Sequence, residues 1–224
     1  MKTLTHSFKK TSALLASGLL SLGLLTSPST VFAAPSEALI SQYNQAAAGD
    51  EDLVETVVAD LTTLIDTEGA QPLSLVYLGS GQTLQGRDAF WPWNKMKLVE
   101  KGLATIDKGL NLMASQKMPT EQQAVVMGLP ERYMARAIAA TTYSQLPDMF
   151  NHFERGYDLY LGLLDEPYIQ QAPFEATSWI YTYAIEAAIR AEDLNQAKLW
   201  LSVMEQRGPD SNETITAKSL INQA

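Results

Sequence analysis

The sequence predicts an all-α protein built from antiparallel helical hairpins, about eight or nine helices in all. Three observations lead to this fold class. Apolar residues recur at intervals of three and four along nearly every segment, which is the spacing of one helix face. No run alternates apolar and polar residues between turn signals, as a half-buried strand would. The connections between periodic segments are short, which favours antiparallel neighbours.

The expected helices follow one another between recognisable boundaries. A first short helix is expected at residues 36–48, and Gly49 and Asp50 end it and begin the next. Seven apolar residues of this second helix form a single stripe: Leu53, Val54, Val57, Val58, Leu61, Leu64 and Ile65. Pro72 suits a first helical position, and a helix over residues 73–84 and a glycine-containing loop follow. The later helices are expected at residues 92–113, 121–143 (broken or bent near 128–130), 148–164, 174–191, 194–206 and 213–222.

The N-terminus has the pattern of a secretory signal peptide over residues 1–33. Three lysines precede the apolar run at residues 13–25, a turn-forming stretch follows, and small side chains predict cleavage after Ala33. The apolar run is too short to cross the ~30 Å hydrocarbon core of a bilayer as a retained helix. The mature chain, residues 34–224, is therefore expected to be a single bacterial periplasmic or secreted domain with no transmembrane segment.

The charge balance argues against nucleic acid as a partner. The chain has 16 basic and 25 acidic residues, a formal charge of −9, and removal of residues 1–33 takes away three lysines and no acid. The mature chain is left with 13 basic and 25 acidic residues, a charge of −12. Proteins that bind nucleic acid need basic side chains to neutralise phosphates. There is no cysteine, and a domain of about 190 residues buries a sufficient core without disulfides.

One window of the chain resembles a tetratricopeptide repeat. In residues 178–210, Glu192 and Asp193 take the place of the Gly-Asp turn, Ala197 fits the small residue of the second helix, and Pro209 falls where the terminal proline belongs. The chain thus resembles a divergent, tetratricopeptide-repeat-like exported protein. The resemblance implies that the hairpins stack as a right-handed superhelix whose surface holds a protein partner.

The resemblance is partial and concerns about two hairpins. Ile185 and Ala188 stand where the family has Gly and Tyr. A second window near the N-terminus has the Gly49-Asp50 turn, but Val54 replaces the small residue and no proline closes the unit. The segment at residues 79–110 is also similar to one in bacterial exported proteins of uncharacterised function, which implies an exported setting and no activity.

The stretch at residues 81–88 has the glycine spacing of a phosphate-binding loop, but not its chemistry. Such a loop needs a Lys that reaches the phosphates and a Ser or Thr that holds magnesium, and Arg87 and Asp88 occupy those positions. It also needs a preceding parallel strand in a doubly wound sheet, for which the sequence offers no candidate. No nucleotide or other cofactor is expected.

The most distinctive segment is the stretch with two tryptophans at residues 87–108. It holds five basic residues against three acidic ones, a local charge of +2 in an acidic chain. Exposed aromatic rings beside basic side chains are typical anchors of a protein interface. The alternative is a loop between helices, in which Gly86 permits the turn and the tryptophans cover a groove between hairpins. The candidate partner-binding residues are Arg87, Asp88, Trp91, Trp93, Lys97 and Lys101.

A second set of residues suggests a small-ligand cavity instead. Arg132 and Arg136 share one helix face, where they either grip a ligand carboxylate or pair with acids of the protein. Trp179 and Tyr183 belong to an aromatic C-terminal half, whose rings form core or line a ligand groove. These four residues are the candidate ligand site of the alternative function, a periplasmic solute-binding accessory protein with an enclosed cavity.

Catalytic and metal chemistry have few candidate residues. His152 is the single histidine of the mature chain, and neither a G-x-S-x-G nor an H-E-x-x-H motif is present. The acidic segment at residues 50–68 lacks the alternating oxygens and the central glycine of a calcium loop. A hydrolase would need two carboxylates about 5–10 Å apart in a cleft, and no spacing singles out such a pair. The sequence therefore predicts no enzyme and no metal site.

These observations predict a noncatalytic exported scaffold or adaptor. It binds a protein partner and belongs to an envelope or transport complex, with the solute-binding accessory protein as the alternative.

Overall fold

The computed structural model describes residues 34–224, and the expected signal peptide lies outside the described residues. The described part is all-α, which confirms the predicted fold class. Its only strands are the two-residue β1 (Val125–Val126) and β2 (Leu129–Pro130). None of its helices combines the length and the apolar character needed to cross a membrane. The ten α-helices of this part are α1 (Glu37–Ala47), α2 (Glu51–Glu68), α3 (Pro72–Asp88), α4 (Pro92–Ser115), α5 (Glu131–Gln145), α6 (Phe153–Leu164), α7 (Pro167–Gln171), α8 (Phe174–Arg190), α9 (Leu194–Arg207) and α10 (Asn212–Gln223).

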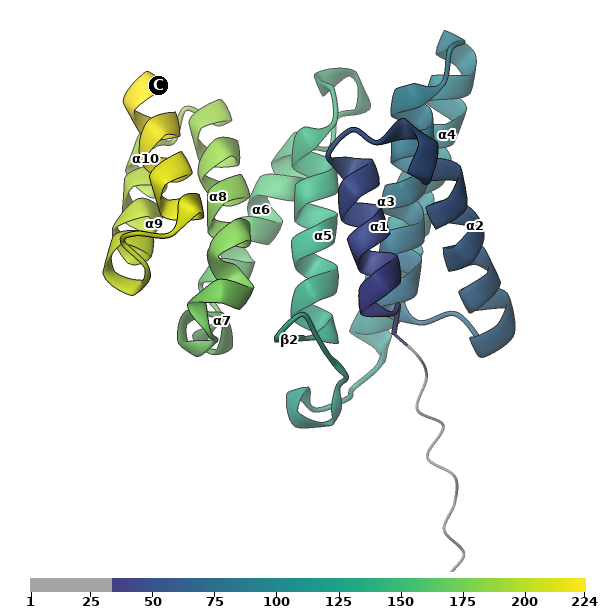
Figure 1. Ribbon diagram of the computed structural model, residues 1–224, viewed down its shortest axis with the longest axis horizontal. Helices are drawn as coiled ribbons and strands as arrows, with labels where there is room; N and C mark the ends of the chain where they lie inside the picture. Colours follow the sequence, from purple (N-terminus) through teal and green to yellow (C-terminus); the bar gives the residue numbers. More distant parts are fainter. Residues whose placement is uncertain (1–33) are drawn as a thin grey trace, which may run out of the picture. The chain divides into compact units, whose positions relative to one another are not determined.

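The helices pair as hairpins that follow one another in chain order (Figure 1). Helix α1 packs on α2, α3 on α4, α5 on α6 and α8 on α9, while α10 contacts both α8 and α9. The pairs are joined through α3, α5 and α8, since α3 contacts α5 and α5 contacts α8. Each hairpin therefore buries its apolar faces against its neighbours along the chain.

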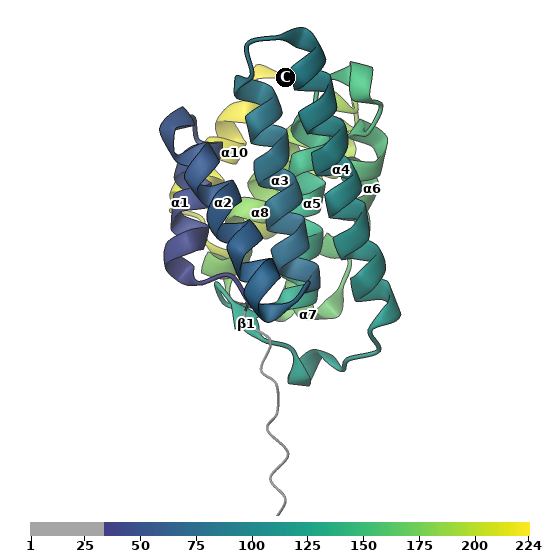
Figure 2. The ribbon, with the colours of Figure 1, turned by 90° about the vertical axis from the view of Figure 1, so that its right-hand side faces the viewer.

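Helix α3 lies between α2 and α4 (Figure 2), and it also contacts α1 and α5. Every residue from Pro72 to Thr83 is buried, because apolar and small side chains surround this part of the helix on all sides. Pro72 occupies the first helical position, as predicted. The end of α3 beyond Thr83 reaches the surface, and there the chain turns into α4.

Small residues let α3 and α4 approach closely. A Cβ built on Gly102 of α4 would lie 2.5 Å from the carbonyl oxygen of Gly79, and one built on Gly79 would lie 2.6 Å from the carbonyl oxygen of Gly102. The backbones of the two helices thus meet directly. The sequence predicted a loop with a turn at Gly86, but this was wrong: α3 continues to Asp88, and Gly86 is buried against Val99 of α4.

Two helix beginnings also differ from the expectation. A break or bend was predicted near residues 128–130 of the helix at 121–143, and the structure has a turn there. Met127 and Gly128 have positive φ values of 50° and 82° and connect β1 to β2, so the helix begins only at Glu131. Glycine favours such a turn. The predicted helix at residues 148–164 begins at Phe153, since a 3₁₀ turn at Asp148–Phe150 ends in the left-handed residue Asn151. Helix α7 was not predicted.

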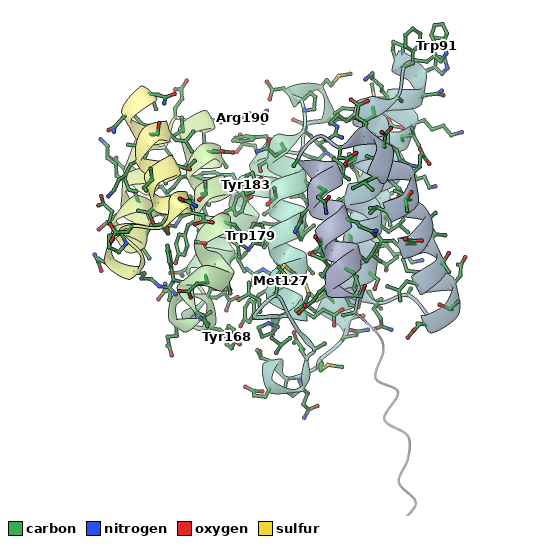
Figure 3. The ribbon with its side chains drawn as sticks, viewed as in Figure 1. Trp91, Met127, Tyr168, Trp179, Tyr183 and Arg190 are labelled. Carbon is green, nitrogen blue, oxygen red and sulfur yellow. The ribbon has the colours of Figure 1, made fainter. Side chains whose placement is uncertain are left out.

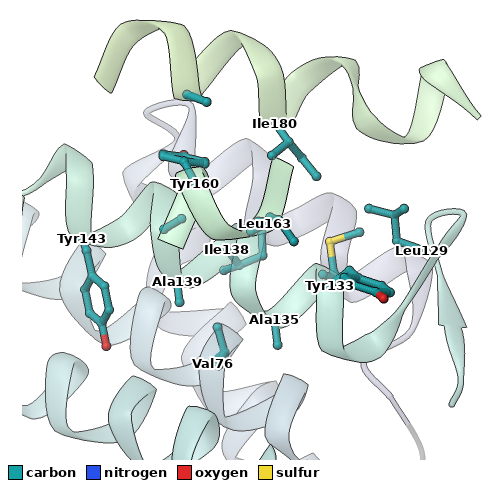
Figure 4. Close-up of a cluster of buried hydrophobic side chains, with 14 of the residues drawn as sticks. Val76, Leu129, Tyr133, Ala135, Ile138, Ala139, Tyr143, Tyr160, Leu163 and Ile180 are labelled. Atoms are coloured by element: carbon teal, nitrogen blue, oxygen red, sulfur yellow. The ribbon is translucent and has the colours of Figure 1, made fainter. Parts of the chain in front are cut away.

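The core is continuous along the hairpins and contains several tyrosines (Figure 4). Small residues of α5, such as Ala135 and Ala139, allow close packing of the neighbouring helices. The buried tyrosine rings fill the remaining space. Two of their hydroxyls bond polar groups of neighbouring elements: Tyr160 bonds Thr141 at 2.7 Å, and Tyr143 donates to Asp107 at 2.6 Å.

Candidate functional site

Three aromatic side chains are exposed together at the turn between α3 and α4. Phe90, Trp91 and Trp93 are 82%, 50% and 63% exposed. They contact one another: Phe90 packs edge-on against Trp91 with centroids 4.9 Å apart, and Trp91 stacks on Trp93 at 4.8 Å. Figure 3 shows Trp91 at the end of the α3–α4 hairpin, away from the other labelled side chains. We call these three residues the aromatic tip.

The backbone holds the aromatic tip in place. Trp91 is the residue before α4, and Pro92 begins the helix with its φ already fixed. The carbonyl of Trp91 accepts hydrogen bonds from the backbone N–H of Asn94 and Lys95, both at 3.0 Å. The Lys95 Nζ donates to the Arg87 carbonyl oxygen at 2.6 Å, which ties the start of α4 to the end of α3. The rings thus project from a well-connected turn.

Arg87 and Asp88 serve the fold of this region. The Arg87 guanidinium donates to the Asp88 carboxylate at 2.6 Å and to the carbonyl oxygens of Ala46 and Ala47 at the end of α1. A cation at a helix C-terminus also interacts favourably with the helix dipole. The hydrogen bond to Asp88 raises the pKa of Arg87. Of the candidate partner-binding residues, Lys97 and Lys101 are exposed on α4.

A cleft of about 590 Å³ opens beside the aromatic tip, between the α3–α4 hairpin and the end of α5. Its size falls in the range of ligand-binding pockets. The apolar part of its lining comes from α3, α4 and the segment after α5, chiefly Leu84, Met96, Val99, Leu146, Met149 and Phe150. Its polar part comes mainly from α1, α5 and α8, namely Tyr43, Thr141, Thr142, Gln145 and Tyr183. Arg87 and Lys95 also line it.

Hydrogen bonds and burial determine the electrostatics of the polar part. Thr142 bonds the buried Ser80 of α3 at 2.7 Å. Gln145 donates to the Glu186 carboxylate of α8 at 3.3 Å. Burial raises the pKa of Glu186, and burial likewise raises the pKa of Tyr43 and of Tyr183. The carboxylate of Glu186 is partly desolvated and is hydrogen-bonded to Gln145 of the lining, but Glu186 does not itself line the cleft.

The structure does not bring the four candidate ligand-binding residues together. Arg136 pairs with Glu166 at 2.6 Å, so its charge is satisfied within the protein. Arg132 lines a different cavity of about 220 Å³. Trp179 donates its indole N–H to the Ala176 carbonyl oxygen and packs edge-on against Tyr183, with centroids 6.4 Å apart. Only Tyr183 of the four lines the cleft.

Figure 3 shows Arg190, Tyr183 and Trp179 along α8, and two hydrogen bonds orient this side of the helix toward α5. Gln145 donates to Glu186, and the Arg190 Nη1 donates to the Ser144 carbonyl oxygen at 2.6 Å. Helix α8 therefore fixes the end of α5, where one wall of the cleft begins.

Glu131 lines the same cavity of about 220 Å³ as Arg132, and the pKa of its carboxyl group is raised. Glu131 accepts a hydrogen bond from the backbone N–H of Leu73, in the first turn of α3, at 3.2 Å. Burial nevertheless raises the pKa of Glu131 above its ordinary value of 4.5. Between that value and its raised pKa, the folded protein binds more protons than the unfolded chain. In this window Glu131 therefore lowers stability as the pH rises.

We expect Glu131→Gln to make the protein more stable at neutral pH, since the amide oxygen still accepts the Leu73 N–H without a charge. The advantage should disappear below pH 4.5, where Glu131 is protonated in both states. Urea unfolding of both proteins from pH 4 to pH 8 measures the difference. Parallel stability curves for the two proteins would contradict the assignment.

His152 and Asp50, which were considered for catalysis and metal binding, stand at the beginnings of helices. His152 precedes α6, its Nδ1 lies 2.5 Å from the Phe150 carbonyl oxygen, and its ring packs against Tyr143. Asp50 stands at the N-cap of α2 but makes no capping hydrogen bond with its side chain. Residues 34–224 contain no group of three or more His, Asp or Glu side chains that could hold a metal ion.

Protein-family models, curated proteins and solved structures all give no significant match. The site must therefore be interpreted from its own geometry.

Sequence reasoning missed two parts of this region. Phe90 was not a candidate, although it is the most exposed of the three rings. The cleft was not predicted either, because its walls come from α3, α4 and the segment after α5, which the sequence does not place together. No local signal in the sequence marks the lining, since residues such as Met96 are ordinary members of a helical segment.

Proposed function

We propose that this protein is a noncatalytic exported scaffold or adaptor, which binds a protein partner at the aromatic tip within an envelope or transport complex. The main observation in support is that Phe90, Trp91 and Trp93 are exposed and contact one another at the turn between two tightly packed helices. The stacking of hairpins in chain order supports, as part of this proposal, a tetratricopeptide-like relationship.

Energetics favour a binding role for the aromatic tip. Three neighbouring aromatic rings in water lose the hydrophobic stabilisation that burial would provide, and contiguous exposed apolar patches mark interaction sites. Aromatic anchors supply a large share of the binding energy in protein interfaces. The tip is held by Pro92 and by the backbone hydrogen bonds to Trp91, so little ordering entropy is lost on binding.

The charges near the tip indicate the chemistry of the partner. Lys97 and Lys101 are exposed on α4, close in sequence to Trp93, while the mature chain as a whole carries a charge of −12. A complementary partner segment therefore has apolar anchors for the rings and carboxylates for the lysines. Its association should weaken as salt is added, because exposed ion pairs are screened.

The test is capture of proteins from envelope extract by the wild-type protein and by a Trp91→Ser/Trp93→Ser variant. We expect the wild type to capture a defined partner protein. The amount captured by the variant should be lower by at least about tenfold. A control variant, Leu199→Ser/Ile215→Ser, removes side chains that are 62% and 56% exposed on α9 and α10. It should capture the partner normally, and circular dichroism should show equal helicity for all three proteins.

Three results would contradict the proposed function. Capture that is unchanged in the tryptophan variant would make the aromatic tip irrelevant to the partner. Equal loss with the control variant would show that exposed apolar residues bind without specificity. Binding to protein-free vesicles that requires Trp91 and Trp93 would instead assign the tip to a membrane surface.

A second candidate function, the holding of a small ligand, is favoured by one observation. The cleft has a volume of about 590 Å³ and combines an apolar lining with a few polar groups, as small-molecule sites do. Its residues differ from the set that the sequence suggested, apart from Tyr183.

A further inference from the structure

The lining of the cleft is divided by chemical character. The side chains from α4 and from the segment after α5 are mostly apolar, with Met96 and Met149 as the flexible members. The side chains from α5 and α8 carry hydroxyl and amide groups, such as those of Gln145 and Tyr183. A ligand that matches this lining is therefore amphiphilic, with an apolar part toward α4 and a polar part toward α8.

The apolar part suits a flexible chain. Met96 is partly buried and Met149 is 69% exposed, so their side chains can adjust around an occupant. Leu146 and Val99 are buried and give this part a fixed apolar floor. Burial of a hydrocarbon chain there is favourable, because it removes apolar surface from water.

The polar part indicates a head group without negative charge. The Glu186 carboxylate accepts a hydrogen bond from Gln145 at 3.3 Å, so an anion placed beside Gln145 would be repelled. The two cations of the lining stand on α3 and α4: Arg87 is paired with Asp88, and Lys95 donates to the Arg87 carbonyl oxygen. Hydroxyl groups, in contrast, can both donate to the Gln145 amide oxygen and accept from the Tyr183 hydroxyl, and both side chains line the cleft.

We propose that the cleft binds a single-chain amphiphile with an uncharged, hydroxyl-bearing head group, its chain lying between Met96 and Met149 and its head beside Gln145 and Tyr183. This assignment rests on the second candidate function and is independent of the role of the aromatic tip.

The test uses 1-monolaurin and laurate, which have the same hydrocarbon chain and differ in the head group. Both are titrated calorimetrically into the exported protein at neutral pH, below their aggregation concentrations. We expect 1-monolaurin to bind with one-to-one stoichiometry and at least about tenfold more tightly than laurate. Laurate binding as tightly as 1-monolaurin would overturn the assignment of an uncharged head group.

Variants test the location of the ligand. Met96→Asp places a charge in the apolar part of the cleft and should weaken 1-monolaurin binding by at least about tenfold. Met118→Asp, a matched change in the smaller cavity, should leave the affinity unchanged. Tyr183→Phe should weaken 1-monolaurin without affecting dodecane-like apolar probes. Equal effects of the two methionine variants would overturn the proposed location.

Binding of the neutral apolar dye Nile red distinguishes two possible failures. Either the ligand class is wrong, or the cleft does not hold a small ligand at all. If Nile red binds in a manner that Met96→Asp abolishes and 1-monolaurin does not bind, the amphiphile assignment fails while the second candidate function stands. If neither probe binds, the second candidate function fails with it. Circular dichroism of each variant shows whether the fold is retained.

Discussion

Gly102→Ala is expected to lower the free energy of unfolding by about 2–3 kcal/mol, although alanine is the better helix former. The added Cβ would lie 2.5 Å from the Gly79 carbonyl oxygen and 2.9 Å from the Thr83 backbone nitrogen. Both atoms belong to the backbone of α3, which is enclosed by four other helices and cannot move aside cheaply. The two helices would have to separate, and their shared core would loosen.

Gly81→Ala is the matched control, because Gly81 of α3, like Gly102 of α4, is a buried glycine within a helix. A Cβ there would meet the Val58 side chain at 3.0 Å, and a side chain yields more easily than a backbone. The gain in helix propensity should offset this contact, so we expect little change in stability. Urea unfolding followed by circular dichroism measures both variants. Equal stabilities for the two would show that the close approach of α3 and α4 is not as described.

Arg190→Met is expected to lower the free energy of unfolding by about 2 kcal/mol. The Arg190 guanidinium donates to the carbonyl oxygens of Ser144 and Leu146 and to the Asp148 carboxylate, and it stacks 4.3 Å from the centroid of Phe153. Methionine retains the apolar stem of the side chain but leaves the two carbonyls at the end of α5 without this donor. Thermal or urea unfolding measures the loss.

Lys218→Met provides the comparison for Arg190. Lys218 pairs with Glu205 at 3.1 Å, and both side chains are about as exposed as that of Arg190. It bonds no backbone carbonyl in the described residues, so its removal should cost less than about 0.5 kcal/mol. If the two variants were equally stable, the contacts of Arg190 would be no more than a surface ion pair. Arg190 bonds the carbonyl oxygen of Leu146, and Leu146 lines the cleft. Arg190→Met should therefore also weaken binding of the proposed ligand, 1-monolaurin.

The positions of most helices along the chain were predictable, because they depend on the local spacing of apolar residues. The beginning of α4 at Pro92 matched the expectation, and the second predicted helix was placed correctly within a few residues. The errors arose where backbone conformation or tertiary packing overrides the spacing. The turn at Met127 and Gly128 interrupts an apolar segment, and α3 runs past Gly86 because that glycine packs against α4. Neither cause is visible in the periodicity.

The site was predictable only in part, for a related reason. The sequence singled out Trp91 and Trp93 but left open whether they form core or surface, since burial depends on what the fold places over them. The structure leaves them half to two-thirds exposed, pairs Arg87 with Asp88, and bonds Arg87 to the end of α1. A spacing rule also grouped Arg132 with Arg136, yet the fold separates their roles: Arg136 pairs with Glu166, whereas Arg132 lines the smaller cavity.

The most direct test of the proposed function is photo-crosslinking in the native envelope, with a benzophenone side chain in place of Trp93. A matched probe in place of Leu199, which is equally exposed on α9, reports random encounters. We predict a discrete adduct with one other envelope protein from position 93 and none from position 199. Equal adducts from both positions, no adduct from position 93, or an adduct only with a second copy of this chain would contradict the adaptor role of the aromatic tip.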